Sequence, residues 1–133
     1  MPNADFGLFI YTPLPLQLEI GQCTMFSTYI DRDTDFLCTA GAYQFVEEEV
    51  DTLRVRIRDD SNGRFLCNDY VPLSLLFGDA ESSGARPWLV PYCFKAGSTI
   101  RTDFLNDPDI EVWLRLFFMG KKVLPDLSSG RTW

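Results

Sequence analysis

One segment near the middle of the chain constrains its structural class more than any other feature. Between residues 53 and 58, Leu, Val and Ile alternate with Arg54, Arg56 and Arg58. Successive side chains of a β-strand point to opposite faces, so this pattern predicts a strand with one apolar face and one charged face. The pair Asn62-Gly63 follows and favours a tight turn, after which residues 64–67 are expected to return antiparallel as a hairpin.

Similar strand signals recur along the chain. Further strands are predicted at residues 14–20, at 25–30, from residue 36 onward, at 88–94, at 99–105 and at 110–118, with turns rich in Gly, Pro, Asn and Asp between them. Residues 72–77 fit either one helical turn or a crossover between sheets. We expect an all-β fold, an antiparallel β-sandwich of about eight strands that is jelly-roll-like, with an immunoglobulin-like sandwich as the alternative.

Length and composition limit the chain to one such domain. A chain of 133 residues buries about two thirds of its surface on folding. Hydrophobic residues make up 46% of the chain, which is too many for intrinsic disorder. We therefore expect a single domain over residues 1–133, with a short polar C-terminal tail at 125–133. The tail ends in Trp133, which is either disordered or docked on a neighbouring chain, and we favour docking.

The charge of the chain disfavours two classes of partner. There are 12 basic and 19 acidic residues, a net charge of −7, which repels nucleic-acid phosphates and anionic membrane surfaces. No apolar run approaches the roughly 20 residues that span a bilayer. The first residues also lack the basic and apolar regions of a secretory signal. These features predict a protein made in the cytoplasm, with neither nucleic acid nor membrane as a partner.

Metal and cofactor chemistry also lacks its usual residues. The chain contains no histidine, and its four cysteines, at positions 23, 38, 67 and 93, include no Cys-x-x-Cys pair. We expect these cysteines to be small buried residues rather than disulfides or ligands. Asp31, Asp33 and Asp35 resemble the start of a calcium loop, but Phe36 and Ala42 stand where that loop needs Gly and Glu. A solvated turn is the favoured interpretation, and no cofactor is expected.

Catalysis is not expected either. Carboxylate pairs at residues 59 and 60 or 107 and 109 offer a general acid and base for glycoside hydrolysis. Each pair lies in a turn signal, however, where Asp is favoured for backbone hydrogen bonding alone. The chain contains no nucleophile elbow and no glycine-rich phosphate loop. We therefore expect a protein that is not an enzyme, with a carboxylate hydrolase as the weaker alternative.

Two sequence features predict contacts with other chains. The strand at 110–118 is apolar on both faces, and Trp113 and Phe117 lie on the face that a lone sandwich exposes to water. A second protein chain is expected to cover that face, most simply in a homo-oligomer. The acidic run Glu47, Glu48 and Glu49 is either a charged edge that prevents sheet pairing or a patch for a basic partner.

Other segments carry weaker contact signals. The polar loop at residues 79–86 is the expected mobile segment and a further candidate contact. Trp88 and Tyr92, with Trp113 and Phe117, are alternatively core residues or a flat aromatic platform for a carbohydrate.

Several short motifs occur in a recognisable order along the chain. They are DRDTDF at 31–36, RIRDDSNGRFL at 56–66, PLSLLFG at 72–78, FKAGSTIRTDFLN at 94–106 and RLFFMGKKV at 115–123. In this order the chain, over about residues 20 to 124, resembles small jelly-roll virion proteins of tailed bacteriophages. The resemblance implies a structural virion protein, a capsid decoration or cement subunit that binds and stabilises the assembled head.

The resemblance leaves the location in the virion open. A collar, head-to-tail or tail accessory protein and a carbohydrate-binding module that contacts a host receptor are alternatives. The implied partners are other virion proteins, such as the major capsid protein or neck components, and the implied oligomer is a homo-oligomer without a cofactor.

Overall fold

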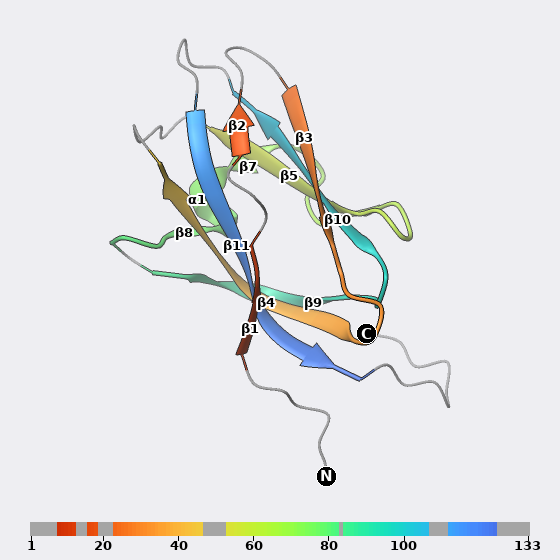
Figure 1. Ribbon diagram of the computed structural model, residues 1–133. Helices are drawn as coiled ribbons and strands as arrows, with labels where there is room; N and C mark the ends of the chain where they lie inside the picture. Colours follow the sequence, from red (N-terminus) through yellow and green to blue (C-terminus); the bar gives the residue numbers. More distant parts are fainter. Residues whose placement is uncertain are drawn as a thin grey trace.

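The computed structural model describes residues 8–12, 16–18, 23–46, 53–82, 84–106 and 112–124. These residues form two β-sheets and one short helix, and the sheets pack face to face (Figure 1). The predicted all-β sandwich is therefore confirmed. Among the described residues, no helix has the length and apolar character that crossing a bilayer would require.

The first sheet has the order β1-β11-β4-β8, with β2 also paired to β11 and β9 also paired to β4. All of its pairings are antiparallel except the short one between β4 and β8. Its strands are β1 (Leu8–Tyr11), β2 (Leu16–Leu18), β4 (Asp35–Phe45), β8 (Gly78–Asp79), β9 (Arg86–Phe94) and β11 (Val112–Val123).

The second sheet has the order β3-β10-β5-β6, with β7 also paired to β5, and is entirely antiparallel. The predicted hairpin is present, because Arg58 pairs with Phe65 and Gly63 takes the positive φ of the turn. Its strands are β3 (Cys23–Tyr29), β5 (Arg54–Asp59), β6 (Arg64–Phe65), β7 (Val71–Pro72) and β10 (Thr99–Leu105).

The strand order is that of a jelly roll. Two strands that pair with the same edge of one neighbour occupy one position. Among the described strands, β1 with β2, β6 with β7 and β8 with β9 therefore count once each, and eight positions result. The first sheet then has the order 1-8-3-6 and the second 2-7-4-5. This arrangement arises when an antiparallel ribbon of the pairs 1-8, 2-7, 3-6 and 4-5 wraps into a double Greek key. An immunoglobulin-like sandwich keeps its first two strands in one sheet, so that alternative is wrong.

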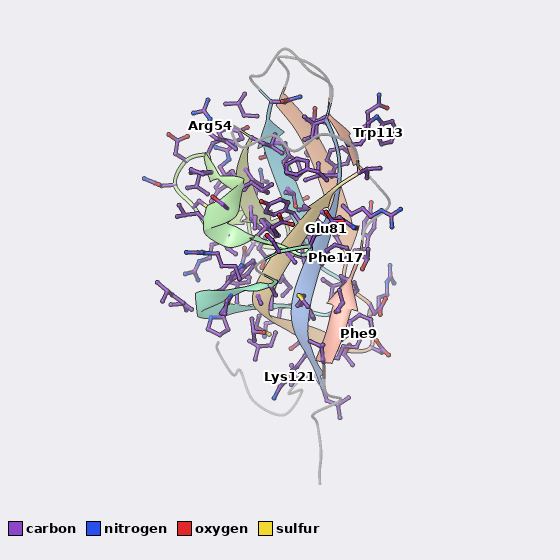
Figure 2. The ribbon with its side chains drawn as sticks, turned by 90° about the vertical axis from the view of Figure 1, so that its left-hand side faces the viewer. Phe9, Arg54, Glu81, Trp113, Phe117 and Lys121 are labelled. Carbon is purple, nitrogen blue, oxygen red and sulfur yellow. The ribbon has the colours of Figure 1, made fainter. Side chains whose placement is uncertain are left out.

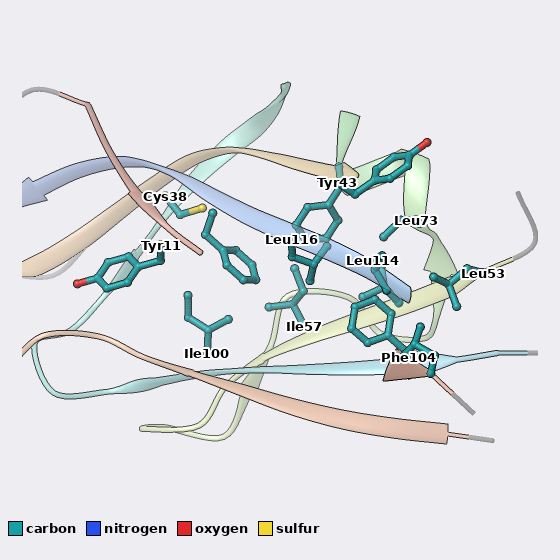
Figure 3. Close-up of a cluster of buried hydrophobic side chains, with 14 of the residues drawn as sticks. Tyr11, Cys38, Tyr43, Leu53, Ile57, Leu73, Ile100, Phe104, Leu114 and Leu116 are labelled. Atoms are coloured by element: carbon teal, nitrogen blue, oxygen red, sulfur yellow. The ribbon is translucent and has the colours of Figure 1, made fainter. Parts of the chain in front are cut away.

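The core lies between the two sheets, where aromatic and aliphatic side chains interdigitate (Figure 3). Strand β5 contributes as its alternation predicted, because Val55 and Ile57 are fully buried while the intervening arginines are half-buried. Among the described residues, five phenylalanines are completely buried: Phe36, Phe77, Phe94, Phe104 and Phe118.

The last strand is longer than predicted. The sequence Gly120-Lys121-Lys122 was expected to end it, but β11 continues through this segment to Val123. The register shifts between Met119 and Gly120, and a Cβ at Gly120 would lie 1.9 Å from the carbonyl oxygen of Leu37. Glycine therefore permits a bulge in which two backbones approach closely, so it continues the strand rather than ending it.

The segment at 72–77 combines both expected structures. Helix α1 (Leu73–Leu76) is a single helical turn, and it connects β7 in the second sheet to β8 in the first. The short strand β1 was not predicted.

Candidate functional site

An apolar groove lies where the sandwich is open at one side. Strand β6 is at the edge of the second sheet and β9 is at the edge of the first, and α1, which connects the two sheets, contacts β9. The groove has a volume of about 710 Å³. Its lining consists of Arg64, Phe65 and Leu66 from β6 and the residue after it, Leu75 and Leu76 from α1, and residues 86–92 from β9.

A bulge in β9 shapes one wall of the groove. Tyr92 pairs with Cys38 and Pro87 pairs with Ala40, so the four residues 88–91 stand against the single residue Thr39 of β4. The extra residues must arch away from the ladder. No described strand pairs with the other edge of β9.

The bulge places large apolar side chains in solvent. Leu89 is fully exposed and Val90 is 80% exposed, although both belong to a strand. Leu75 of α1 and Phe65 of β6 are also exposed, at 56% and 42%. Adjacent exposed apolar side chains around one groove are uncommon on an isolated soluble domain.

Two hydrogen bonds hold the walls of the groove in place. The indole N–H of Trp88 donates to the carbonyl oxygen of Leu76 at 2.8 Å and so ties β9 to α1. The hydroxyl of Tyr92 donates to Oδ2 of Asp59 at 2.6 Å and so ties β9 to the second sheet. Burial, reinforced by this bond to Asp59, raises the pKa of Tyr92. The tyrosine therefore remains protonated and keeps donating.

The charge on the groove is positive, in contrast to the rest of the chain. Of the described residues that line it, Arg64 and Arg86 carry charge. The Arg64 guanidinium lies 5.7 Å from the ring centroid of Tyr92, and within the described part of the chain neither arginine forms an ion pair with a carboxylate. Both side chains are exposed.

Further arginines stand on the outer face of the second sheet. The Arg56 guanidinium lies 4.6 Å from the ring centroid of Phe65, and that of Arg58 lies 5.4 Å from it. Arg56 also pairs with Asp103 and Arg58 with Asp60. These contacts explain why β5 tolerates Arg56 and Arg58 on one face.

Trp113 and Phe117 lie on the face of β11 that the sequence predicted. Leu114 and Leu116 between and beside them are buried, whereas Trp113 and Phe117 are half-buried on the outer face of the first sheet. Figure 2 shows Trp113 toward one end of β11 and Phe117 near its middle. Their role in a contact with another chain stays a prediction.

Other predicted contact residues cannot be placed. Glu47, Glu48, Glu49 and Trp133 lie outside the described residues. In the loop at 79–86, the Asp79 carbonyl oxygen accepts from the backbone N–H of Gly84 at 2.8 Å, which makes part of this loop a compact turn.

The predicted aromatic platform is not a single surface. Trp88 and Tyr92 line the groove, but Trp113 and Phe117 belong to β11 at the centre of the first sheet, outside the groove lining. The period-two pattern at 88–94 also fails at Val90, because the bulge turns this side chain into solvent.

Asp31 and Asp35, in the segment that resembles the start of a calcium loop, each bind a partner within the chain. Asp31 accepts a hydrogen bond from Lys122 at 2.6 Å, and buried Asp35 accepts one from the backbone N–H of Ala96 at 2.8 Å. Among the described residues, no group of three carboxylate or cysteine side chains is placed to hold a metal ion. Cys38 and Cys93 are buried as predicted, and burial raises the pKa of Cys38 to about 12. The prediction is wrong for Cys67, which is only partly buried in the turn region after β6.

The carboxylates of residues 59 and 60, the weaker alternative as a catalytic pair, have different surroundings. Asp59 is buried and accepts from Tyr92 and from Ser61, whereas Asp60 is exposed and pairs with Arg58. Residues 107 and 109 lie outside the described part of the chain.

The exposed residues of the groove were missed by sequence reasoning. A signal was present, because Pro87 and Pro91 enclose three consecutive apolar residues, and proline within a strand indicates an edge or a bulge.

Comparisons with known proteins found no relative of this chain. No family model, curated protein or solved structure matches the chain.

Proposed function

We propose that this chain is a structural protein of a tailed-bacteriophage virion, a capsid decoration or cement subunit that binds the assembled head and stabilises it. The observation that carries the proposal is the exposed apolar rim of the groove, where Leu89 and Val90 stand side by side in solvent. A rim of this kind on an otherwise well-packed sandwich is typical of a surface that another protein covers.

The fold supports the proposal by analogy. Eight-stranded jelly rolls occur in viral capsid domains, and they also occur in lectins and enzymes. The order of the strands is therefore compatible with the virion role that the sequence motifs suggested, while the assignment depends on the surface rather than on the fold.

The function would be mechanical. Burying a leucine or valine side chain contributes about 1.5–3 kcal/mol before association costs, so Leu89 and Val90 contribute to a contact that the rest of the groove must complete. The hydrogen bonds of Trp88 and Tyr92 hold the groove in one shape before the partner arrives. A collar, head-to-tail or tail accessory subunit would use the same surface at another place in the particle.

A carbohydrate-binding module is the second candidate, and one observation favours it. Trp88 and Tyr92 both line the groove, and the amide nitrogen of Asn62 lies 3.5 Å from the hydroxyl oxygen of Tyr92. A sugar bound there would quench the fluorescence of Trp88. A decoration protein predicts no such response to host glycans.

The test is incorporation into particles. Phage that lack the gene are grown with the protein supplied from a plasmid, either as wild type or as Leu89→Ser with Val90→Ser. We expect immunoblots of purified particles to detect the wild-type protein and to show at least about tenfold less of the double variant.

The control is Tyr29→Ser, which removes an exposed aromatic side chain from β3 at the edge of the second sheet opposite β6. This variant should be incorporated like wild type. Absence of the wild-type protein from purified particles would contradict the proposal.

A further inference from the structure

The side-chain exposure, the edge-strand backbone and the charge of the groove between β6 and β9 indicate which kind of partner covers it. Leu89 and Val90 line the groove, yet Leu89 is fully exposed and Val90 is 80% exposed, so neither side chain is enclosed within it. Sites for small molecules bury most of their ligand in a concave pocket. Exposed side chains of this kind are instead buried only when a larger surface closes over them, so the occupant is a segment of protein.

The mode of recognition follows from the edge strand itself. Pro87 and Pro91 flank the bulge of β9 and lack backbone N–H groups. A partner strand therefore cannot form a continuous hydrogen-bonded ladder along this edge. Side chains of the groove must supply most of the recognition.

The charge of the occupant follows from the two arginines. Arg64 and Arg86 are exposed, and among the described residues no carboxylate pairs with either of them, in a chain of net charge −7. In contrast, Arg56 and Arg58 outside the groove both have carboxylate partners. The unpaired cations beside an apolar surface are complementary to carboxylates set among apolar side chains.

We propose that the groove binds an extended, acidic segment of a different protein chain, whose apolar side chains cover Leu89 and Val90 and whose carboxylates pair with Arg64 and Arg86. This inference rests on the proposed structural role, because it specifies the partner of the same surface. In a virion the segment would belong to a neighbouring structural protein.

Fluorescence anisotropy with the purified full-length protein tests the charge requirement. The probes are two labelled ten-residue peptides, one alternating valine with glutamate and one alternating valine with lysine. We expect the glutamate peptide to bind at least about tenfold more tightly, with an affinity that falls as salt is raised. Equal affinities, or no binding of the glutamate peptide at millimolar protein, would overturn the proposal.

Charge reversal locates the site. Arg64→Glu with Arg86→Glu should reverse the preference between the two peptides, whereas Arg115→Glu, an exposed arginine on β11, should leave it unchanged. Circular dichroism melts confirm that each variant is folded. If the reversal at residues 64 and 86 has no effect, the groove is not the binding site and the proposal fails.

Two further results distinguish a different protein chain from a second copy of this chain, and failure of this inference from failure of the proposed virion role. Analytical ultracentrifugation of the protein alone should show no association that depends on Arg64 and Arg86. If it does, the occupant is a second copy of this chain and the proposal is wrong. Peptide binding is measured without particles. If the peptide does not bind while the protein is still found in purified virions, the inference about the partner is wrong and the proposed virion role stands.

Discussion

At the scale of single residues, the contact between Tyr92 and Asp59 connects the groove to the core. The buried Asp59 carboxylate accepts hydrogen bonds from the Tyr92 hydroxyl, from the Ser61 hydroxyl at 2.7 Å and from the Ser61 backbone N–H at 3.1 Å. A buried carboxylate is tolerated only when such donors surround it. The residue that shapes the groove therefore also satisfies a charge inside the sandwich.

Tyr92→Phe removes one of these donors while keeping the ring. We expect a loss of about 1.5–3 kcal/mol in the free energy of unfolding, because the hydrogen bond involves a charged group. Urea denaturation of the variant and of wild type measures the difference. Tyr29→Phe, an exposed tyrosine on β3, is the control and should be neutral. A loss below about 0.5 kcal/mol for Tyr92→Phe would show that water replaces the hydroxyl.

The ion pair between Asp31 and Lys122 predicts a pH dependence. The hydrogen bond from Lys122 lowers the pKa of Asp31, and the same bond raises the pKa of Lys122. The pair therefore stabilises the folded chain above the ordinary pKa of Asp31, and the stabilisation is lost as the pH falls through its lowered pKa. At the alkaline end it is present below the ordinary pKa of lysine and is lost as the pH rises through the raised value.

The measurement compares wild type with Asp31→Asn by urea denaturation across the acid range. The stability difference should be constant near neutral pH and disappear in strong acid. It should be small, because the Asp31 side chain is half-exposed. Nuclear magnetic resonance titration should show a higher Asp31 pKa in Lys122→Met. An unchanged Asp31 pKa in that variant would disprove the assigned cause.

At the scale of elements, the sequence predicted those strands whose two faces differ. The segment at 53–58 was recognised because three aliphatic residues alternate with three arginines. The strand at 110–118 is apolar on both faces, and Trp113 and Phe117 were assigned to its outer face by the period of two alone. The alternation of side chains along a strand indicates which face is buried. The prediction of that face is therefore correct where the hydrogen-bonded ladder is regular.

The same rule failed where the ladder is interrupted. The exposure of Leu89 and Val90 depends on extra residues that face Thr39 across the sheet, and this register is a property of two strands rather than of one. The continuation of β11 past Gly120 likewise depends on how closely Leu37 approaches it. Pairings between distant segments decide both features, and local patterns carry no information about them.

Gly120→Ala tests the importance of the register shift between β11 and β4, where Thr39 of β4 is the extra residue. A Cβ at this position would collide with the Leu37 backbone, so we expect the variant to lose about 3 kcal/mol or more, or to fail to fold. Gly63→Ala is the matched control, because it has open space and only an unfavourable positive φ, with an expected loss of about 1 kcal/mol. Thermal unfolding followed by circular dichroism ranks the two variants. Equal losses would mean that β11 shifts to accommodate the methyl group.

At the scale of the whole molecule, the jelly roll closes around its core and is open at one edge. Strands β6 and β9 end the two sheets at the same side, so the wrapping that defines the fold also creates the groove. The outer side chains of the second sheet concentrate arginines near this edge, in a chain that is acidic overall. We propose that other protein chains dock at this edge.

A cryo-electron microscopy map of intact particles tests that claim most directly. The map should contain the eight-stranded jelly roll on the particle, with Leu89 and Val90 buried against a neighbouring chain and carboxylates facing Arg64 and Arg86. A particle in which the chain is present but its β6–β9 groove faces solvent, or a particle that lacks the chain altogether, would contradict the account.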